Sequence, residues 1–417
     1  MLLKGLLILT LCLLVITKKF RVLDIMYVQL WEFALFLSII VWSYHKALSK
    51  TIHFRVDSLN IALIIFLIIN VFSSIRMPEH AGSFMKGGLW YNLRTVEPVL
   101  LYILLRDYFS SRSNIKPFIH VILGALFIEC LLALTQSLTS MQWSFIGGSQ
   151  PDEQMRGYIY YFTGIGSPVV SPVTGTFEHF NEFGFYLSIF VPLIVSFGLS
   201  RAIAPSLTIS LLTLNIAALL LTYSRGALLG TAIGLSVMGI ISLRRKPFLL
   251  FLSLVFVLAA TAVVLQLFVS KGYEETLNLS ARVEIWEKAF DVISKNPINF
   301  IFGTGSGTHL YWTQYEAEGH YYSPHNAYLM FWLETGLIGL LSFLSITFIF
   351  FLKMFRTFLH SSLAVAKAVS LSMLGIGSSL LVQQCFQIGF AEHATKALVL
   401  TVMALSMGIS DFQVRKQ

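Results

Sequence analysis

The side chains best suited to chemistry in this 417-residue sequence stand at the edges of long apolar segments. Arg225 lies between two such segments, and Arg282 begins a stretch in which polar and apolar residues alternate with helical spacing. His325 and Asn326 open a later apolar segment, and Glu334 follows about two helical turns inside it. Because charged groups at membrane depth or at the ends of spans are costly, each of these residues needs a reason to be there.

Two arginines beside a histidine suit a substrate that carries a diphosphate. Arginine presents a planar, permanently charged fork that matches phosphate oxygens. A histidine can take a proton from an attacking hydroxyl, while the arginines stabilise negative charge on the leaving diphosphate. The chain has no Asp-x-Asp pair, and its three cysteines fit no metal-ligand spacing. We therefore expect neither a metal-dependent nucleotide-sugar site nor a cofactor.

A further polar group opens another apolar segment with Glu178, His179, Asn181 and Glu182. Arg94 is a candidate substrate-binding residue by its position alone. Each candidate also has a simpler interpretation: an arginine at a helix end often extends its charge to the interface, and a Ser-Pro-His-Asn sequence can cap a helix. Only the combination of these residues indicates a site.

The composition fixes the class of protein that must position these residues. Hydrophobic residues make up 56% of the chain and charged residues only 12%, which excludes a soluble enzyme. The apolar residues fall into blocks of about 20, the length that crosses a bilayer as a helix. We predict an all-α, polytopic membrane protein that forms one integral membrane domain over residues 1–417. The twelve expected spans are 2–17, 25–43, 59–75, 88–108, 115–138, 178–200, 205–223, 226–243, 247–269, 326–352, 365–390 and 395–410.

Lysine and arginine counts predict the orientation. With both termini in the cytoplasm, the inside segments hold 16 Lys and Arg and the outside segments hold 13, of which four lie in one long loop. Long loops count little in the positive-inside rule, so the balance supports this orientation, although Lys18, Lys19 and Arg21 disagree with it. The net charge of +8 is thus a topology signal, and we do not expect nucleic-acid binding.

The long loop, residues 270–325 between the ninth and tenth spans, should face away from the cytoplasm. Its residues 280–295 predict an amphipathic helix with Val283, Trp286, Phe290 and Ile293 on the apolar face. Asn296-Pro297 should end this helix. The GTGSG sequence at 303–307 lacks the Lys-Ser/Thr of a phosphate-binding loop, so we interpret it as a flexible turn.

Three motifs in this order resemble the bacterial O-antigen ligase and O-antigen polymerase superfamily. They are TYSRGALLG at 222–230, ARVEIWEKA to NPINFIFGTGSG at 281–307, and PHNAYLMFWLETGLIG at 324–339. The likeness is best from about residue 175 to residue 341, whereas the first 140 residues match only as apolar spans. The ordered set of motifs is typical of the superfamily but does not single out one member.

The resemblance implies a metal-independent glycosyltransferase in the bacterial inner membrane, with its active site facing the periplasm. Such enzymes move a glycan from undecaprenyl diphosphate to an acceptor sugar. By motif match, Arg225 and Arg282 would hold the diphosphate and His325 would activate the acceptor hydroxyl. Asn326 and Glu334 would support substrate binding, as would His179 and Asn181 on the donor side.

Members of the superfamily differ in their acceptor. An O-antigen ligase uses the lipid A–core oligosaccharide, and a polymerase of O-antigen or exopolysaccharide uses another lipid-linked repeat. We favour the ligase slightly for the compact twelve-span layout. A transporter or flippase of polysaccharide or lipid is the alternative from another class. It would need polar groups near mid-membrane, for which only Glu129, Gln136, Asn215 and the Gln383-Gln384 pair qualify.

Overall fold

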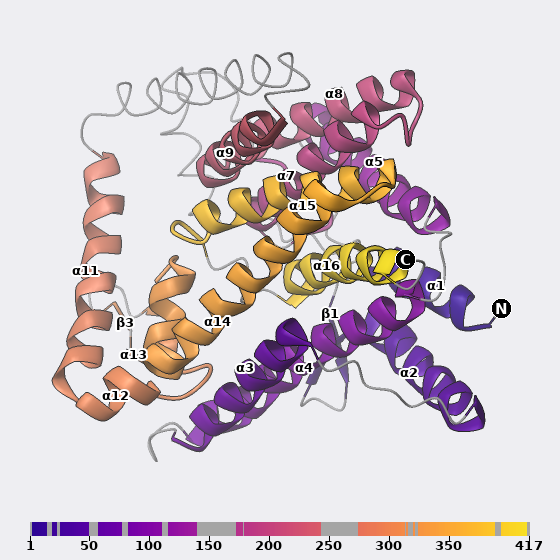
Figure 1. The fold of residues 1–417 in the computed structure, drawn as a ribbon. Coiled ribbons are helices and arrows are strands. Elements are labelled where there is room, and N and C mark those ends of the chain that lie inside the picture. Colours follow the sequence, from indigo (N-terminus) through magenta and orange to yellow (C-terminus); the bar gives the residue numbers. More distant parts are fainter. Residues whose placement is uncertain are drawn as a thin grey trace.

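The structure is a computed structural model, and Figure 1 shows its helices packed as a bundle. It describes residues 2–14, 19–22, 26–49, 57–76, 82–110, 116–139, 172–177, 179–242, 274–312, 314–315, 320–321, 324–387 and 393–414. The helices are α1 (Leu2–Leu14), α2 (Leu30–Ser49), α3 (Ser58–Ile75), α4 (Gly82–Ser110), α5 (Lys116–Thr139), α7 (Phe180–Leu199), α8 (Pro205–Leu221), α9 (Arg225–Ser242), α11 (Glu274–Lys295), α12 (Pro297–Phe302), α13 (His309–Trp312), α14 (Ala327–His360), α15 (Ala364–Gln383) and α16 (His393–Val414).

The predicted all-α, polytopic architecture is confirmed. Seven helices in the described part of the chain are long and apolar enough to cross a membrane, and α1 and α8 are shorter apolar helices. Every predicted span contains a helix except 247–269, which lies outside the described residues. Both chain ends lie on the same side of the bundle, at the right of Figure 1, and α11 to α13 lie on the opposite side. This placement agrees with an even number of crossings.

The predicted start of the second span at residue 25 is wrong. Strand β1 (Lys19–Val22) pairs antiparallel with β2 (Met26–Gln29), and α2 begins only at Leu30. The strand segments read Lys-Phe-Arg-Val and Met-Tyr-Val-Gln, rich in β-branched and aromatic residues that favour an extended chain. A second pair of strands, β3 (Gln314–Tyr315) and β4 (His320–Tyr321), is only two residues long on each side.

The centre of the bundle is α7, in which every residue from Phe183 to Phe197 is buried. Beside it, α9 packs closely on α15 through small residues. A Cβ atom added to Gly234 would lie 2.5 Å from the carbonyl oxygen of Gly375, so the two helix backbones nearly touch. Large apolar side chains such as Phe36, Phe72 and Phe348 point outward, as expected where helices face lipid.

Four helices are joined by a charged network around Arg106. The Arg106 guanidinium in α4 contacts Asp57, which caps the start of α3, and its Nε donates to Asp411 of α16 at 2.9 Å. Lys353 of α14 also reaches Asp57, at 2.8 Å. Burial opposes charge on Asp57, but hydrogen bonds from Arg106 and Lys353 outweigh it and lower the pKa of this carboxyl. No pattern in the sequence predicts this network.

The predicted amphipathic helix exists, and of its predicted apolar face Ile293 and Trp286 pack on the bundle whereas Val283 and Phe290 are exposed. It is α11, it starts six residues earlier than expected, and it ends before Asn296, whose side chain caps α12 at 2.9 Å. The buried residues are Ile285, Ala289 and Ile293, which share the i, i+4 spacing of one helical row. Val283 and Phe290, predicted for the apolar face, are exposed because the row that packs on α14 lies to one side of them.

The interpretation of residues 303–307 as a flexible turn is wrong, because the turn is buried and hydrogen-bonded to α14. Helix α14 breaks at Gly336, where φ is +70°, and the break frees two carbonyl groups. Thr304 donates its backbone N–H to the carbonyl of Leu333 at 2.8 Å, and Gly305 donates to that of Glu334 at 3.0 Å. The turn therefore satisfies the carbonyls that the break exposes.

Candidate functional site

His325 lies directly before α14 in a strained backbone conformation. Its φ is +47°, in the left-handed region that side-chain-bearing residues seldom adopt. Asn326 caps α14, since its side-chain oxygen accepts a hydrogen bond from the Leu329 N–H at 3.1 Å. The backbone N–H of Ala327, the first residue of α14, donates to the carbonyl of Gln384 at 2.9 Å. This bond fixes the start of α14 against the end of α15. The hydrogen bonds of Asn326 and Ala327 thus hold His325 in its strained conformation.

Helix α11 brings Arg282 to this loop. Trp286 stands one helical turn after Arg282, and its indole N–H donates to the carbonyl of Pro324 at 2.7 Å. That bond ties α11 to the residue immediately before His325. In Figure 1, α11 runs along the outside of the bundle and reaches the start of α14 through α12 and α13.

Three positively charged or chargeable side chains act on His325. Burial lowers its pKa most, and Arg282, His179 and His309 lower it further, to about 4. His325 is therefore neutral at neutral pH, and a neutral imidazole carries one ring nitrogen without a proton. Arg282 and His179, both predicted from the sequence, therefore act electrostatically on His325.

His179 and Asn181 lie at the start of α7 and connect it to the start of α9. His179 caps α7, and its Nδ1 accepts a hydrogen bond from the Asn181 N–H at 3.0 Å, so a neutral ring carries its proton on Nε2. Burial lowers the pKa of His179 to about 4. The Asn181 side-chain oxygen accepts a hydrogen bond from the Ser224 hydroxyl at 2.8 Å. The fourth residue of this junction is Gln387, which donates to Ser224 at 3.0 Å.

Arg225 follows Ser224 and begins α9. The residue before that serine, Tyr223, has a φ of +54°, a second left-handed backbone at the candidate site. Gly184 allows the backbone at Tyr223 and Ser224 to approach α7 closely, because a Cβ atom at this glycine would lie 2.7 Å from the Ser224 side chain. The Ser224–Asn181 hydrogen bond thus holds the start of α9, where Arg225 stands, against the start of α7.

Glu334 lies away from any open surface. It is fully buried, and its Oε1 lies 2.5 Å from Nδ1 of His309, the first residue of α13. Its backbone carbonyl accepts hydrogen bonds from Gly305 and from the Ser73 hydroxyl. Glu334 therefore contacts the second histidine near His325, and the expectation that it supports substrate binding stays a prediction.

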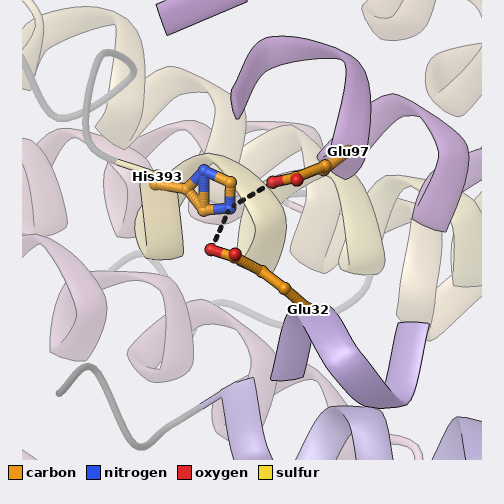
Figure 2. A group of neighbouring side chains, drawn as sticks. All are labelled: Glu32, Glu97 and His393. Carbon is orange, nitrogen blue, oxygen red and sulfur yellow. Dashed lines mark ion pairs between the residues drawn. The ribbon is translucent and has the colours of Figure 1, made fainter. Parts of the chain in front are cut away.

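Arg94 belongs to a different group of side chains. It acts electrostatically on Glu32 and Glu97, and neither carboxyl is affected by Arg282 or His325. Figure 2 shows Glu32 of α2 and Glu97 of α4 pointing at one ring nitrogen of His393 from α16. This nitrogen, Nε2, lies 3.5 Å from Glu32 and 3.3 Å from Glu97.

Glu32, Glu97 and His393 offer three ligand atoms within 4.8 Å of one another, a geometry that could hold a metal ion. Two cations already face the same carboxylates, however, since Arg94 acts on both and Lys396 acts on Glu97. The positive charges of Arg94 and Lys396 therefore already act on the two carboxyl groups. A divalent ion would leave this buried group with excess positive charge, so its charge gives no reason to assign a metal.

Sequence reasoning missed His309, Ser224 and Gln387. His309 stands in a short helix without hydrophobic periodicity, and Gln387 follows the end of a span. Only their contacts identify them: His309 with Glu334, and Gln387 with the Ser224 and Asn181 side chains. The left-handed backbone of His325 and Tyr223 also had no signal in the residue types.

An apolar cavity lies elsewhere in the bundle, among α3, α4, α14, α15 and α16. Its walls include Phe66, Phe343 and Met373, with Lys396 and Gln384 as polar members. None of the predicted site residues lines it, so this cavity is not the open cavity that a site around His325 would need.

Residues 209–344 match the sequence model of the O-antigen ligase family. The matched segment contains Arg225, Arg282, His325, Asn326 and Glu334, together with His309. It confirms the resemblance to the O-antigen ligase and polymerase superfamily and supports a glycosyltransferase of that type. No curated protein matches the chain.

Proposed function

We propose that this chain, a member of the O-antigen ligase and polymerase superfamily through residues 209–344, is a membrane glycosyltransferase with a lipid-linked donor. It moves a glycan from undecaprenyl diphosphate to an acceptor sugar on the outer face of the bacterial inner membrane. The acceptor is the lipid A–core oligosaccharide, as for an O-antigen ligase. The reacting groups face the periplasm and the donor lipid enters from the bilayer.

The observation that carries this proposal is the grouping of Arg282 and His179 around a neutral, backbone-constrained His325. These residues come from α11, the cap of α7 and the loop before α14, which are far apart in sequence. The Ser224–Asn181 hydrogen bond, which ties the start of α9 to the first turn of α7, supports placing Arg225 in the same site. A neutral histidine beside permanently charged arginines suits proton removal next to an anionic leaving group.

In the proposed reaction, the acceptor hydroxyl oxygen forms a bond to the anomeric carbon of the donor sugar. The bond from that carbon to the diphosphate oxygen breaks, and undecaprenyl diphosphate leaves with the electron pair. His325 takes the hydroxyl proton, while Arg225 and Arg282 hold the diphosphate oxygens. Asn326 acts mainly as the cap that positions His325, and Asn181 positions the start of α9. Arg94 has no part in this step, because it belongs to the Glu32–Glu97–His393 group.

The test is transfer by a His325→Ala variant in a strain that lacks the native gene. We expect ligated glycan to fall by about 100-fold or more, the range that general base catalysis contributes. His360→Ala is the matched control, since His360 is an exposed histidine at the end of α14. Both variants must reach the membrane in normal amount. Near-normal transfer by His325→Ala would overturn the mechanism.

Gene deletion separates the ligase from the polymerase of the same superfamily. Gel analysis of surface glycans should show unligated polymer held on its lipid carrier if the chain is a ligase. Lipid A–core capped by a single repeat would instead identify a polymerase.

The transporter alternative needs polar groups that line a path, and three of its five candidates are engaged in structural hydrogen bonds. Glu129 accepts from the Thr176 hydroxyl at 2.8 Å, and Gln136 donates to the carbonyl of Gly175 at 2.7 Å. Asn215 donates to the carbonyl of Leu187 at 3.2 Å. These contacts tie neighbouring helices and loops together, which favours the enzyme over a transporter.

A further inference from the structure

Helix α12 presents an apolar face to the outside of the protein. Ile298, Ile301 and Phe302 are 54%, 41% and 50% exposed, and none of the six residues of α12 is buried. The three side chains share the i, i+3, i+4 spacing that places residues on one face of a helix. A helix that faced water would carry polar residues at these positions. The face therefore calls for an apolar partner.

Helix α3 shows at which level of the membrane α12 lies. Its 18 residues rise about 27 Å, close to the thickness of about 30 Å of a bilayer core. It starts at Asp57, which pairs with Lys353 at 2.8 Å and lies on the side of the chain ends, because Arg106 joins it to Asp411 near the C-terminus. It ends at its cap, Arg76. Charged residues at the two ends of an apolar span mark the two membrane interfaces, so Arg76 marks the interface opposite the chain ends.

Arg76 holds α12 at this interface. Its guanidinium donates to the carbonyls of Gly303 at 2.9 Å and Ile298 at 3.1 Å, and it lies 5.9 Å from the centre of the Phe302 ring. The side-chain oxygen of Asn299 is a third acceptor, at 3.4 Å. These acceptors are neutral, so none of them cancels the positive charge of Arg76. A positive charge at this level attracts the phosphate groups of lipids.

The elements on both sides of α12 belong to the membrane surface. Phe72 and Ile75 in the last turn of α3 are 65% and 75% exposed, as side chains that face lipid are, and Ile75 directly precedes Arg76. On the other side, the indole N–H of Trp332 in α14 donates to the carbonyl of Phe300 at 3.2 Å, and the two rings are 5.2 Å apart. Tryptophan is enriched where a membrane meets water. The exposed face of α12 thus adjoins a surface that already contacts lipid.

We propose that α12 is an interfacial anchor, and that its face of Ile298, Ile301 and Phe302 inserts into the lipid bilayer on the side opposite the chain ends. The partner is the bilayer itself: its acyl chains receive the apolar face, and its phosphate groups lie beside Arg76. An amphipathic helix of this kind lies in the plane of the interface, with its apolar face about 5–10 Å into the headgroup and acyl boundary. This inference does not depend on the proposed glycosyl transfer.

The anchor fixes one end of α11 at the membrane surface. Helix α11 ends at Lys295, and α12 begins at Pro297 after the single cap residue Asn296. Nearer its other end, Trp286 ties α11 to the loop before α14. Helix α11 is thus held at two points, one on the protein and one on the lipid. Figure 1 shows α11 and α12 together at the side of the bundle away from the chain ends.

The test places an environment-sensitive fluorophore on a single cysteine of the full-length protein in phospholipid vesicles. The native cysteines, Cys12, Cys130 and Cys385, are first replaced by alanine. Ile301→Cys then carries the probe on α12. Nitroxide-labelled phospholipids quench a probe that touches acyl chains, and aqueous iodide quenches one that touches water. We expect lipid labelled near the top of its acyl chain to quench the probe at position 301.

Two control positions bracket the result. Arg201→Cys, in the exposed turn after α7, should be quenched by iodide and not by labelled lipid. Ile68→Cys, near the middle of α3 and 48% exposed, should be quenched best by lipid labelled deep in its acyl chain. Iodide should quench the probe at position 301 about fivefold less than the probe at position 201, because an inserted face is shielded from water.

A second variant tests whether the apolar face holds α12 in the bilayer. Ile298→Asp, added to the chain labelled at position 301, should lower quenching by lipid by about half or more, because a carboxylate is costly among acyl chains. Ile298→Leu is the matched control and should leave the quenching unchanged. If the cysteine-free chain does not fold, a photoreactive amino acid at position 301 of the native chain should cross-link to phospholipid.

Three results would overturn the inference. Iodide quenching at position 301 as strong as at position 201 would place the face in water. Protection from both quenchers, or cross-linking to protein, would show that a protein surface such as a second copy of the chain covers it. Equal quenching in Ile298→Asp and Ile298→Leu would show that the apolar face does not hold α12. None of these results bears on the proposed function, which His325→Ala tests separately.

Discussion

Gly303 and Gly336 lie backbone to backbone where the chain after α12 crosses the break in α14. Both have left-handed φ values, +74° and +70°. A Cβ atom on Gly303 would overlap the carbonyl of Glu334, and one on Gly336 would overlap the carbonyl of Ile301. This crossing sets the position of Glu334, and through it that of His309.

Gly336→Ala should therefore destabilise the protein by about 3 kcal/mol or more, since strained backbone and overlap act together. Thermal unfolding in detergent measures the effect. Gly124→Ala in α5 is the control, because nothing lies within 4 Å of a Cβ there, and it should be neutral or slightly stabilising. Equal behaviour of the two variants would contradict the close crossing.

Arg225→Lys should lower glycan transfer by about tenfold or more, because a single ammonium cannot reproduce the two parallel hydrogen bonds of a guanidinium to a diphosphate. Steady-state kinetics of the purified protein provide the measurement. Arg201→Lys is the control, since Arg201 is exposed in the turn after α7. If position 225 requires only a positive charge, Arg225→Lys will be as active as Arg201→Lys, and the prediction will be wrong.

The contribution of His179 and His325 to stability should fall as the pH drops from about 6.5 to about 4. The folded pKa values of His179 and His325 are both lowered to about 4, against about 6.5 in the unfolded chain. Within that window the unfolded state binds more protons at these two histidines, so their protonation favours unfolding. Each histidine adds at most one proton to the slope, about 1.4 kcal/mol per pH unit.

Unfolding measured between pH 7.5 and 4.5 tests this dependence. Asp57 stays ionised throughout the range because its pKa is lowered, so it does not contribute to the slope. Replacing both histidines by glutamine should remove this contribution, so the stability of the double variant should fall less, relative to its value at pH 7.5, than that of the wild type. An unchanged slope in that double variant would assign the pH dependence to other groups.

Lys396→Met should lower the free energy of unfolding of the protein by about 3–5 kcal/mol, since it removes a cation from beside the carboxylates of Glu32 and Glu97. Lys396 is buried and its ammonium donates to Thr95 at 3.0 Å. Adding Glu97→Gln in the same chain should recover part of the loss, and a double-mutant cycle in thermal unfolding measures that coupling. A fall in Tm on adding a chelator to the wild type would show instead that a metal ion compensates these carboxylates.

The sequence by itself determined the class of the protein and the identity of several candidate site residues. Blocks of apolar residues specify membrane helices because a bilayer core forces backbone groups to pair within each helix. The scarcity of charge made Arg225, Arg282 and His325 stand out. Residue types also indicated the helix end at Asn296, since a proline follows it.

Only the tertiary structure decided which of these residues meet. Arg94 and Arg282 are equally plausible by type, yet helix packing places Arg94 with Glu32 and Glu97, and Arg282 near His325. His309 is identified only by its contact with Glu334, which lies 25 residues later in the sequence. No local sequence pattern encodes such a contact. The face of α11 and the burial of the 303–307 turn likewise depend on α14, because packing against a neighbour, rather than residue type, selects which side of an element is enclosed.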